Sequence, residues 1–365
     1  MRHNKNNDII HVEVEPQTEA MKMCYGASYF LEEHKAMELQ RDGVVKIIDK
    51  EYLNLSYAFV DVQAQQLSIE QRSSFMQSRR KMKIAWVQDQ SSLGGAELSN
   101  IGVIKAGLDC GFDIVQVTPK RFNKNILLNS DIIILNNIFE FDVDQFADIL
   151  SALFFFAKPY IKYDHDLREL KRLNITRRVF ERSLFNVFIS PAHYEAYADV
   201  YGERLIDRSK ILPLSIDTDL FRLRDDLERK PKSAIIPTFA KNHEGHTAFM
   251  REHRDWTFTV MKTPHKFTDA NVSQINSAPI ERMAELYSKH EYMVHLPLSR
   301  GAGERVYFEA MMCGCKPIVN KNVSHESWNV EPPHATYEEV KDMLTLAPYT
   351  FWKEVDERAK DHCLL

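Results

Sequence analysis

Short apolar segments alternate with helical segments from Lys83 onward, and this alternation constrains the fold more than any other feature. Continuous apolar segments separated by helices indicate strands of a parallel sheet that is covered on both faces. We therefore predict an α/β chain. The expected strands are 84–88, 113–117, 131–135, 159–163 and 186–190, and then 234–237, 257–261, 292–296 and 316–320.

A polar, charged stretch, Arg222–Lys232, divides this alternation into two halves and is the best candidate for a linker. We expect a Rossmann-like domain at 82–222, a second at 232–345, and a helix at 346–365. Ligands of open parallel sheets bind at the carboxyl ends of the strands. The expected site is therefore a central cleft between the facing ends of the two sheets.

Residues 1–80 differ from the rest and form an N-terminal extension to which we assign no role. A helical pattern covers 21–39, and a strand is expected near 43–48. A Gln- and Ser-rich stretch, 63–78, leads to the basic string that precedes the first α/β strand.

Composition excludes several classes of protein. The 365 residues carry 47 basic and 52 acidic side chains, a net charge of −5, so the chain is not basic throughout. Hydrophobic residues make up 44% and charged residues 27%, so the chain is not wholly disordered. No apolar segment is long enough to span a membrane, and we expect no transmembrane segment and no secretory signal. Five cysteines without a metal-type pair suggest reduced thiols and a cytoplasmic location.

Glycine is scarce, at 12 of 365 residues, and part of this small number falls in two short stretches. The first contains Gly94 and Gly95 between a predicted strand and a predicted helix. Backbone N–H groups at a glycine-rich helix start can approach a phosphate or a sugar. A plain tight turn is the alternative interpretation.

The second glycine-rich stretch also joins a strand to a helix and offers free amides beside two arginines, a combination that suits a diphosphate. Glu309 lies further along this helix, where its carboxylate can accept hydrogen bonds from ribose hydroxyls. The candidate donor-binding residues of this turn are Arg300, Gly301, Ala302, Gly303 and Arg305.

His165 lies between Asp164 and Asp166 at the end of a predicted strand. A histidine oriented by carboxylates can contact a sugar hydroxyl or a reacting centre. The alternative is a strand-end turn in which Asp166 caps the next helix. The following segment, 168–182, has a net charge of +4 and is either a solvated helix face or a face that binds a polyanion.

Four motifs in this order resemble the retaining glycosyltransferases of the GT-B fold, family-4-like. They are GGAE from Gly94, YDHD from Tyr163, LPLSIDTDLF at 212–221 and GERVYFEAMMCGCKPIV at 303–319. The resemblance implies two Rossmann-like domains, with a nucleotide-sugar donor bound mainly by the second and the acceptor by the first. A weaker resemblance, to the α-glucosyltransferase that modifies bacteriophage DNA, rests on the glutamate spacing and on the HD element before a basic helix.

The resemblance also implies roles for individual residues. Gly94 and Gly95 would form the loop near the donor phosphates, His165 would contact the transferred sugar, and Glu309 would bind the ribose. The family's first glutamate falls on Gly301 in this chain, so Glu304 is the nearest carboxylate that can replace it. Lys241 would supply the positive charge that this family places after the first strand of the second domain.

These expectations describe a hexosyltransferase-like enzyme that moves a sugar from a nucleoside-diphosphate-sugar, in particular a UDP-sugar, to an acceptor hydroxyl with retention. The acceptor would be a glycan, a glycolipid or a small molecule, and neither a cofactor nor a metal ion is expected. One alternative is a nucleic-acid glucosyltransferase that holds DNA on 168–182. A second alternative is a non-catalytic GT-B binding subunit. The Asp-x-Asp pairs at 142–144, 164–166 and 217–219 are interpreted as structural.

Overall fold

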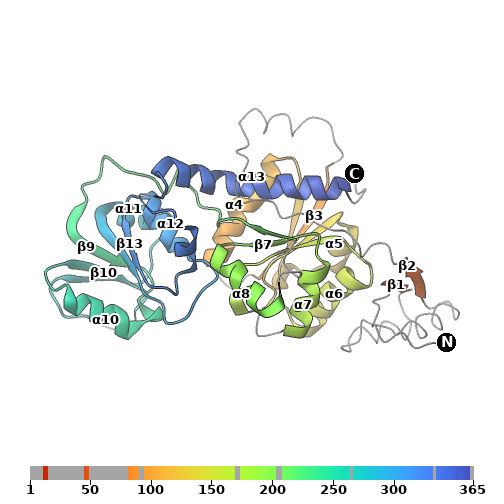
Figure 1. The fold of residues 1–365 in the computed structure, drawn as a ribbon, viewed down its shortest axis with the longest axis horizontal. Helices are drawn as coiled ribbons and strands as arrows, with labels where there is room; N and C mark the ends of the chain where they lie inside the picture. Colours follow the sequence, from red (N-terminus) through yellow and green to blue (C-terminus); the bar gives the residue numbers. More distant parts are fainter. Residues whose placement is uncertain are drawn as a thin grey trace.

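The computed structural model describes residues 11–14, 45–48, 81–89, 94–168, 173–202, 208–263, 266–331 and 334–361. Its main body has two lobes, each built around one parallel sheet (Figure 1). The predicted α/β class with two parallel sheets is confirmed. No helix in these ranges is both long and apolar enough to cross a membrane.

The sheet of the N-terminal lobe has the strand order β4-β3-β5-β6-β7-β8, and all neighbouring strands are parallel. Ile132 and Ile134 of β5 enter one apolar core, and Ile133 and Leu135 enter the core on the opposite face. Burial on both faces explains why this strand is a continuous apolar run. The strands are β3 (Lys83–Val87), β4 (Asp113–Val117), β5 (Ile132–Leu135), β6 (Tyr160–Tyr163), β7 (Asn186–Phe188) and β8 (Ser209–Ile211).

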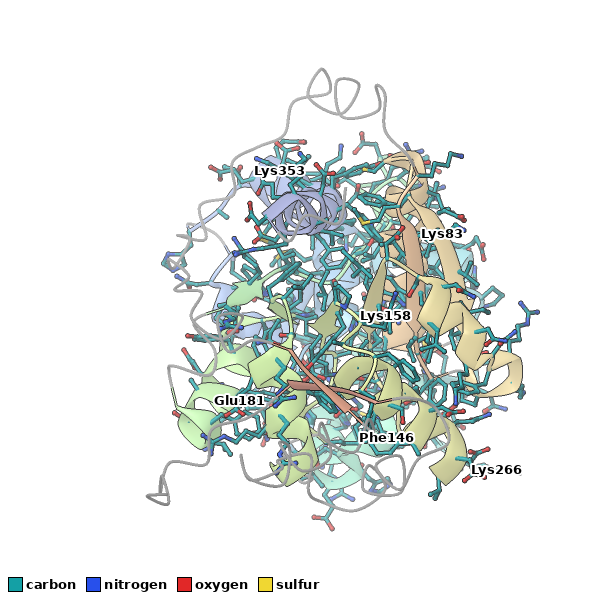
Figure 2. The ribbon with its side chains drawn as sticks, turned by 90° about the vertical axis from the view of Figure 1, so that its right-hand side faces the viewer. Lys83, Phe146, Lys158, Glu181, Lys266 and Lys353 are labelled. Atoms are coloured by element: carbon teal, nitrogen blue, oxygen red, sulfur yellow. The ribbon has the colours of Figure 1, made fainter. Side chains whose placement is uncertain are left out.

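Helices cover both faces of this sheet (Figures 1 and 2). Lys83 and Lys158, labelled in Figure 2, mark the amino ends of β3 and β6. Gly111 follows the first helix with a φ of +87°, the left-handed conformation that glycine adopts at a helix C-terminus. The helices are α4 (Gly95–Asp109), α5 (Lys124–Asn129), α6 (Val143–Phe154), α7 (Leu173–Arg182) and α8 (Pro191–Tyr201), with a 3₁₀ turn η2 (Pro119–Arg121).

The sheet of the C-terminal lobe has the order β11-β10-β9-β12-β13 and is also parallel. Its strands are β9 (Lys230–Ile236), β10 (Thr257–Met261), β11 (Val272–Ile275), β12 (His290–His295) and β13 (Lys316–Val319). The helical segments of this lobe are α10 (His243–Glu252), α11 (Ile280–Lys289) and α12 (Arg305–Met312), with 3₁₀ segments η4 (Phe239–Lys241) and η5 (Ser324–Trp328).

The last helix, α13 (Tyr337–Asp361), joins the two lobes (Figure 1). Val340 and Leu344 pack in the core of the C-terminal lobe, whereas Trp352 packs in the core of the N-terminal lobe. Trp352 also donates a 2.6 Å hydrogen bond from Nε1 to the carbonyl of Val103 in α4. The helix begins at Tyr337 rather than at the predicted 346. Its first turns, which carry Val340 and Leu344, pack on the core of the C-terminal lobe.

The positions of several strands differ from the predicted ones or add to them. β8 and β11 were not predicted, because β8 is very short and the central residues of β11, Ser273 and Gln274, are polar and exposed. β9 begins at Lys230, so the predicted linker ends in exposed strand. Near the N-terminus, the strand expected near 43–48 is β2 (Val45–Ile48), which pairs antiparallel with β1 (His11–Val14). The helical pattern at 21–39 and the stretch 63–78 lie outside the described residues.

Candidate functional site

Loops at the carboxyl ends of the two sheets meet between the lobes. Ser190, after β7, donates a 2.7 Å hydrogen bond to the carbonyl of Ala302, which follows β12. The backbone N–H of Ala192 donates to Ser327 Oγ over 3.0 Å. In parallel sheets these edges carry the ligand-binding loops. The candidate site is therefore the region where the loops of both lobes face each other.

Arg305 links the lobes at the start of α12. Its side chain is buried, and Nε donates to Glu309 Oε1 over 2.8 Å. Nη1 donates to Ser99 Oγ in α4 over 3.0 Å and to the Ser215 carbonyl over 2.6 Å. A Cβ placed on Gly95 would lie 3.4 Å from Arg305 Cδ. Gly95, predicted from one motif, is thus brought together with Arg305 and Glu309, which were predicted from another.

A chain of amide side chains fixes the orientation of His165. The indole of Trp86 can only donate, and it donates over 2.8 Å to Gln88 Oε1. That oxygen also receives the Asn100 amide hydrogen over 2.8 Å, so the oxygen of Asn100 faces the opposite way. Asn100 Oδ1 then accepts from His165 Nε2 at 3.0 Å and from Asn136 Nδ2 at 3.0 Å.

His165 is therefore held as the tautomer with its proton on Nε2. Burial lowers its pKa to about 3, and the nearby positive charge of Arg305 acts in the same direction. The ring is neutral at physiological pH and stacks on Tyr163 with centroids 4.9 Å apart. Its Nδ1 is an acceptor with no hydrogen-bond partner among the described residues. The arrangement offers a fixed, neutral acceptor to a ligand.

Asp164 forms buried ion pairs at the same strand end. Its carboxylate pairs with Lys162 Nζ at 3.1 Å and with His193 Nε2 at 3.0 Å, and all three side chains are buried. The Lys162 charge and the His193 hydrogen bond outweigh desolvation and hold the pKa of Asp164 well below its usual range. His193 is a structural residue, because its Nδ1 also accepts from the Ile189 N–H over 3.3 Å.

Glu304 is a buried carboxyl group immediately before α12. Its Oε2 accepts from the Ser324 N–H over 3.1 Å, whereas Oε1 has no partner in the described parts of the chain. Desolvation raises its pKa to about 7, against the opposing charges of Lys241 and Arg300. A Cβ on Gly301 would collide with Oε1, so this position suits glycine. Glu304 can act as a hydrogen-bond donor or as an anion near neutral pH.

Two histidines that the sequence analysis did not place in the site lie at the same edge. His295, at the end of β12, is buried, and its Nδ1 lies 2.6 Å from Thr238 Oγ1. His325 donates from Nδ1 to the Glu304 carbonyl over 2.9 Å. Burial lowers the pKa of both, to about 3 and about 4. Nε2 of His295 lacks a hydrogen-bond partner within the described ranges, whereas Nε2 of His325 is packed against Gly303 and Ile189. His295 ends β12 and His325 follows β13, so the predicted positions of these strands are the signal that could have placed both at this edge.

The remaining predicted donor residues lie in the loops and helix starts of both lobes. Lys241 and Arg300 are exposed, and their positive charges lower the pKa of Glu304. Gly303 lies against His325 and Ile189, where a Cβ would collide with the imidazole. Ala302 packs in the core of the N-terminal lobe, so it contributes to the interface between the lobes. Gly94 is the N-cap residue of α4. Contact of these residues with a donor stays a prediction.

The Asp-x-Asp pairs have structural partners. Asp142 caps α6 by accepting from the Gln145 N–H at 2.8 Å, and Asp217 accepts from the Asp219 and Leu220 N–H groups at 3.1 and 3.0 Å. Asp166 accepts from the Arg168 N–H at 2.9 Å, although α7 begins only at Leu173. Within the described ranges, no group of three His, Cys, Asp or Glu side chains could hold a metal ion.

Several arginines of 168–182 are engaged within the chain. Arg168 pairs with Asp166 and lies 4.5 Å above the Phe139 ring, and Arg177 pairs with Glu181 at 2.9 Å. Arg182 lies over the Phe154 ring at 5.5 Å. Residues 169–172 lie outside the described residues. These pairings give the DNA-binding alternative no support, and it stays a prediction.

The fold was compared with known proteins. The structure aligns with HepE of Anabaena, solved in complex with UDP-glucose, at a TM-score of 0.52 and 13% identity over 77% of this chain and 95% of that chain. It aligns with a glycosyltransferase from Rickettsia africae at a TM-score of 0.53 and 14% identity, covering 77% of this chain and 99% of that chain. This chain has the GT-B fold.

The expected GT-B architecture of two facing sheets is therefore confirmed. No protein-family model matches the sequence, and no curated protein sequence matches it either. At identities this low, the structural likeness concerns the fold, and a function must be argued from the residues of the site.

Proposed function

We propose that this GT-B protein transfers a sugar from a nucleoside-diphosphate-sugar to an acceptor hydroxyl. The observation that carries the proposal is a set of buried polar atoms without partners where the two lobes meet. Such atoms are rare in folded proteins and cost on the order of 1–3 kcal/mol each when unsatisfied. Three of those found in the described residues belong to this edge and are open to such a role: His165 Nδ1, Glu304 Oε1 and His295 Nε2. A polar ligand seated between the lobes would satisfy them.

The donor diphosphate would lie at the start of α12. Lys241 and Arg300 are exposed cations on this edge, and the helix N-terminus adds a partial positive charge. The Glu304 side chain does not cap α12. Glu309 gives one carboxylate oxygen to Arg305, and its other oxygen has no partner among the described residues. We infer that this second oxygen accepts hydrogen bonds from the ribose.

UDP is the nucleotide we favour, because HepE was solved with UDP-glucose and the expected donor is a UDP-sugar. The sugar would lie beside His165. With the proton fixed on Nε2, His165 Nδ1 would accept a hydrogen bond from a sugar hydroxyl. Glu304, with its pKa near neutrality, would donate to or accept from another polar group of the donor.

The transfer exchanges one bond at the anomeric carbon for another. The bond from C1 to the diphosphate oxygen breaks, and its electron pair stays on the phosphate. The acceptor oxygen forms the new bond to C1 on the same face, and its proton passes to the leaving phosphate. The products are the nucleoside diphosphate and a glycoside of unchanged anomeric configuration. Fixed cations and helix amides would stabilise the charge that develops on the leaving group, so we propose that no metal ion is required.

Positioning of the two substrates would supply much of the rate. Arg305 and α13 connect the lobes, so the donor loops and the acceptor loops are held at one edge. The acceptor would be a glycan, a glycolipid or a small molecule in the cytoplasm. Three described cysteines, Cys110, Cys313 and Cys315, are free thiols, which is consistent with a reducing compartment.

The test is a binding screen followed by a turnover assay. Thermal shift against nucleoside diphosphates and their sugars should show stabilisation by a UDP-sugar, because a ligand of the native state raises stability by mass action. Turnover should release UDP with or without EDTA. No stabilisation by any nucleotide-sugar would refute the proposal. Binding without transfer to any acceptor would favour the non-catalytic alternative, and loss of turnover in EDTA would refute metal independence.

A further inference from the structure

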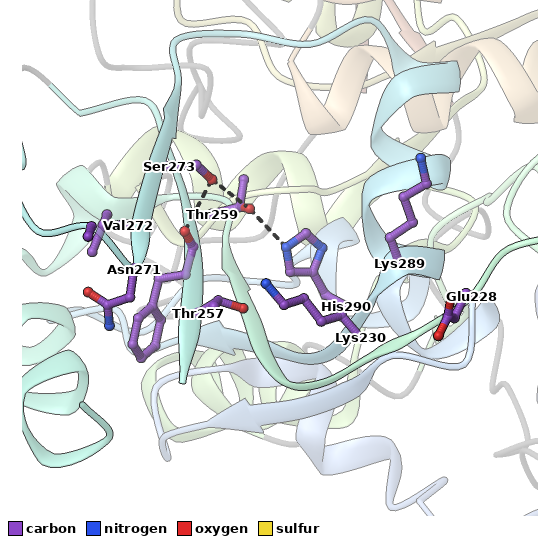
Figure 3. Close-up of a pocket in the computed structure, with 11 residues that line it drawn as sticks. Glu228, Lys230, Thr257, Thr259, Asn271, Val272, Ser273, Lys289 and His290 are labelled. Atoms are coloured by element: carbon purple, nitrogen blue, oxygen red, sulfur yellow. Dashed lines mark hydrogen bonds between the residues drawn. The ribbon is translucent and has the colours of Figure 1, made fainter. Parts of the chain in front are cut away.

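A polar pocket lies at the edge of the C-terminal sheet opposite to the candidate site. It has a volume of about 410 Å³ and is lined by residues at the amino ends of four parallel strands (Figure 3). Lys230 begins β9, Thr257 begins β10, Val272 begins β11 and His290 begins β12. The pocket is distinct from the facing carboxyl edges, because β9 has seven residues and so spans about 20 Å between the two edges.

A directed chain of hydrogen bonds crosses the floor of this pocket. His290 Nδ1 donates to the Leu286 carbonyl over 2.7 Å, so its Nε2 is an acceptor, and burial lowers the pKa of the ring. Thr259 therefore donates its hydroxyl hydrogen to His290 Nε2 over 2.8 Å. Ser273 gives its hydrogen to the Phe258 carbonyl at 3.2 Å or to Thr259 Oγ1 at 3.0 Å (Figure 3).

These hydrogen bonds leave lone pairs, rather than hydrogens, for a ligand. The oxygens of Thr259 and Ser273 can still accept, since their hydrogens are already donated. Asn271 donates its amide hydrogens to the carbonyls of Arg254 and Trp256, at 3.3 and 2.8 Å. Its oxygen is thus also left as an acceptor. A ligand that matches this surface brings several hydrogen-bond donors, as the hydroxyls of a sugar do.

Lys230 adds a positive charge to the acceptor-rich pocket. Its amine points toward the side of the pocket lined by Thr257 and His290 (Figure 3), and no carboxylate within the described parts of the chain pairs with it. Lys289 also lines the pocket but is paired with Glu285. Glu228 also lines the pocket, and its negative charge opposes the positive charge of Lys230. Lys230 is therefore the group that can receive an anion.

We propose that this pocket binds a small polyhydroxylated anion of the sugar-phosphate class, with its hydroxyls on Thr259 and Ser273 and its phosphate on Lys230. The volume suits such a molecule, since small-ligand sites typically span about 300–1,000 Å³. Lysine is a common phosphate ligand in the form of a point charge. The site does not depend on nucleotide-sugar transfer at the other edge.

Isothermal titration of the full chain with glucose 6-phosphate tests the proposal, with UDP present to occupy the other edge. We expect one molecule bound per chain. Lys230→Ala should weaken binding about tenfold, the effect of losing one charged hydrogen bond. Ser273→Ala should also weaken it. Lys266→Ala, at an exposed lysine of the same lobe, is the matched control and should leave affinity unchanged. Lys230 and Ser273 are exposed, so neither substitution should prevent folding.

Two further ligands separate the contributions of hydroxyls and charge. Glucose and inorganic phosphate should each bind at least about tenfold more weakly than glucose 6-phosphate, because each lacks one half of the recognised chemistry. Equal binding of inorganic phosphate, unaffected by Ser273→Ala, would mean an adventitious ion only and would overturn the proposal. Absence of binding at millimolar concentration, or equal affinity in Lys230→Ala, would overturn it as well.

Discussion

Arg305 and Ser99 join the two lobes of this protein directly, through a hydrogen bond of 3.0 Å from Nη1 to Oγ. Arg305 begins α12 and Ser99 lies in α4, so the contact connects the first helix of one lobe to the proposed donor helix of the other. The same guanidinium holds Glu309 at 2.8 Å. The geometry of the Glu309 carboxylate, which we propose binds the ribose, and the packing of the lobes therefore depend on one side chain.

Replacing Arg305 by methionine should strongly destabilise the protein. It would leave the Glu309 carboxylate buried and unpaired, which typically costs about 3–5 kcal/mol. Urea unfolding of the single variant and of the double variant Arg305→Met/Glu309→Leu measures the effect. The double variant should regain most of the lost stability, since it buries no unpaired charge. Equal unfolding of wild type and the single variant would show that the pair is not stabilising.

Glu309→Gln should weaken binding of the nucleotide by about 1–3 kcal/mol, the value of a charged hydrogen bond. Titration calorimetry with UDP gives this difference. Glu338→Gln changes an exposed glutamate at the start of α13 and serves as the control. Unchanged affinity in a folded Glu309→Gln protein would rule out its contact with the ribose.

His165→Ala should lower turnover more than it lowers affinity for the donor. A general acid–base or hydrogen-bonding group at a reacting sugar contributes about 10²–10⁴-fold to the rate, whereas the nucleotide provides most of the binding contacts. Comparing kcat with the Kd for UDP separates the two effects, and His334→Ala, at an exposed histidine, is the control. A His165→Ala protein with full turnover would contradict the assigned role.

Glu304→Gln should change how stability depends on pH. Burial raises the pKa of Glu304 from 4.5 to about 7, so the folded state retains a proton that the unfolded state releases. The free energy of unfolding therefore falls as pH rises from about 5 to about 7, by at most about 3 kcal/mol from this group. Urea unfolding at pH 5 and pH 8 should show Glu304→Gln gaining stability over wild type at pH 8 only. Glu281→Gln, at an exposed position, should show no such gain. The same difference from wild type at both pH values would disprove the shift.

Local patterns in the sequence predicted most strands of both sheets. Asp113–Val117 and Thr257–Met261 have the predicted bounds, and three of the five residues in each are apolar. β11 escaped prediction because Ser273 and Gln274 interrupt any apolar run. The longer α13 also escaped it, since its first turns are defined by packing on the distant core that contains Leu344.

Contacts between residues of the candidate site could be predicted from the sequence only where both residues belong to one motif. The spacing of Arg305 and Glu309 already allows an i,i+4 ion pair. The bond between Asn100 and His165 joins residues 65 apart in the chain, so no local pattern reveals it. His295 and His325 are isolated in the sequence and become candidates only because parallel strands bring their ends to one edge.

Hydrogen–deuterium exchange with and without UDP tests most directly whether a diphosphate binds at the start of α12. Bound phosphate would engage the backbone N–H groups at the first turns of two helices. The account predicts slower exchange in peptides that cover 94–97 and 301–307 when UDP is present. Unchanged exchange in both segments at saturating UDP, or protection confined to other parts of the chain, would contradict it.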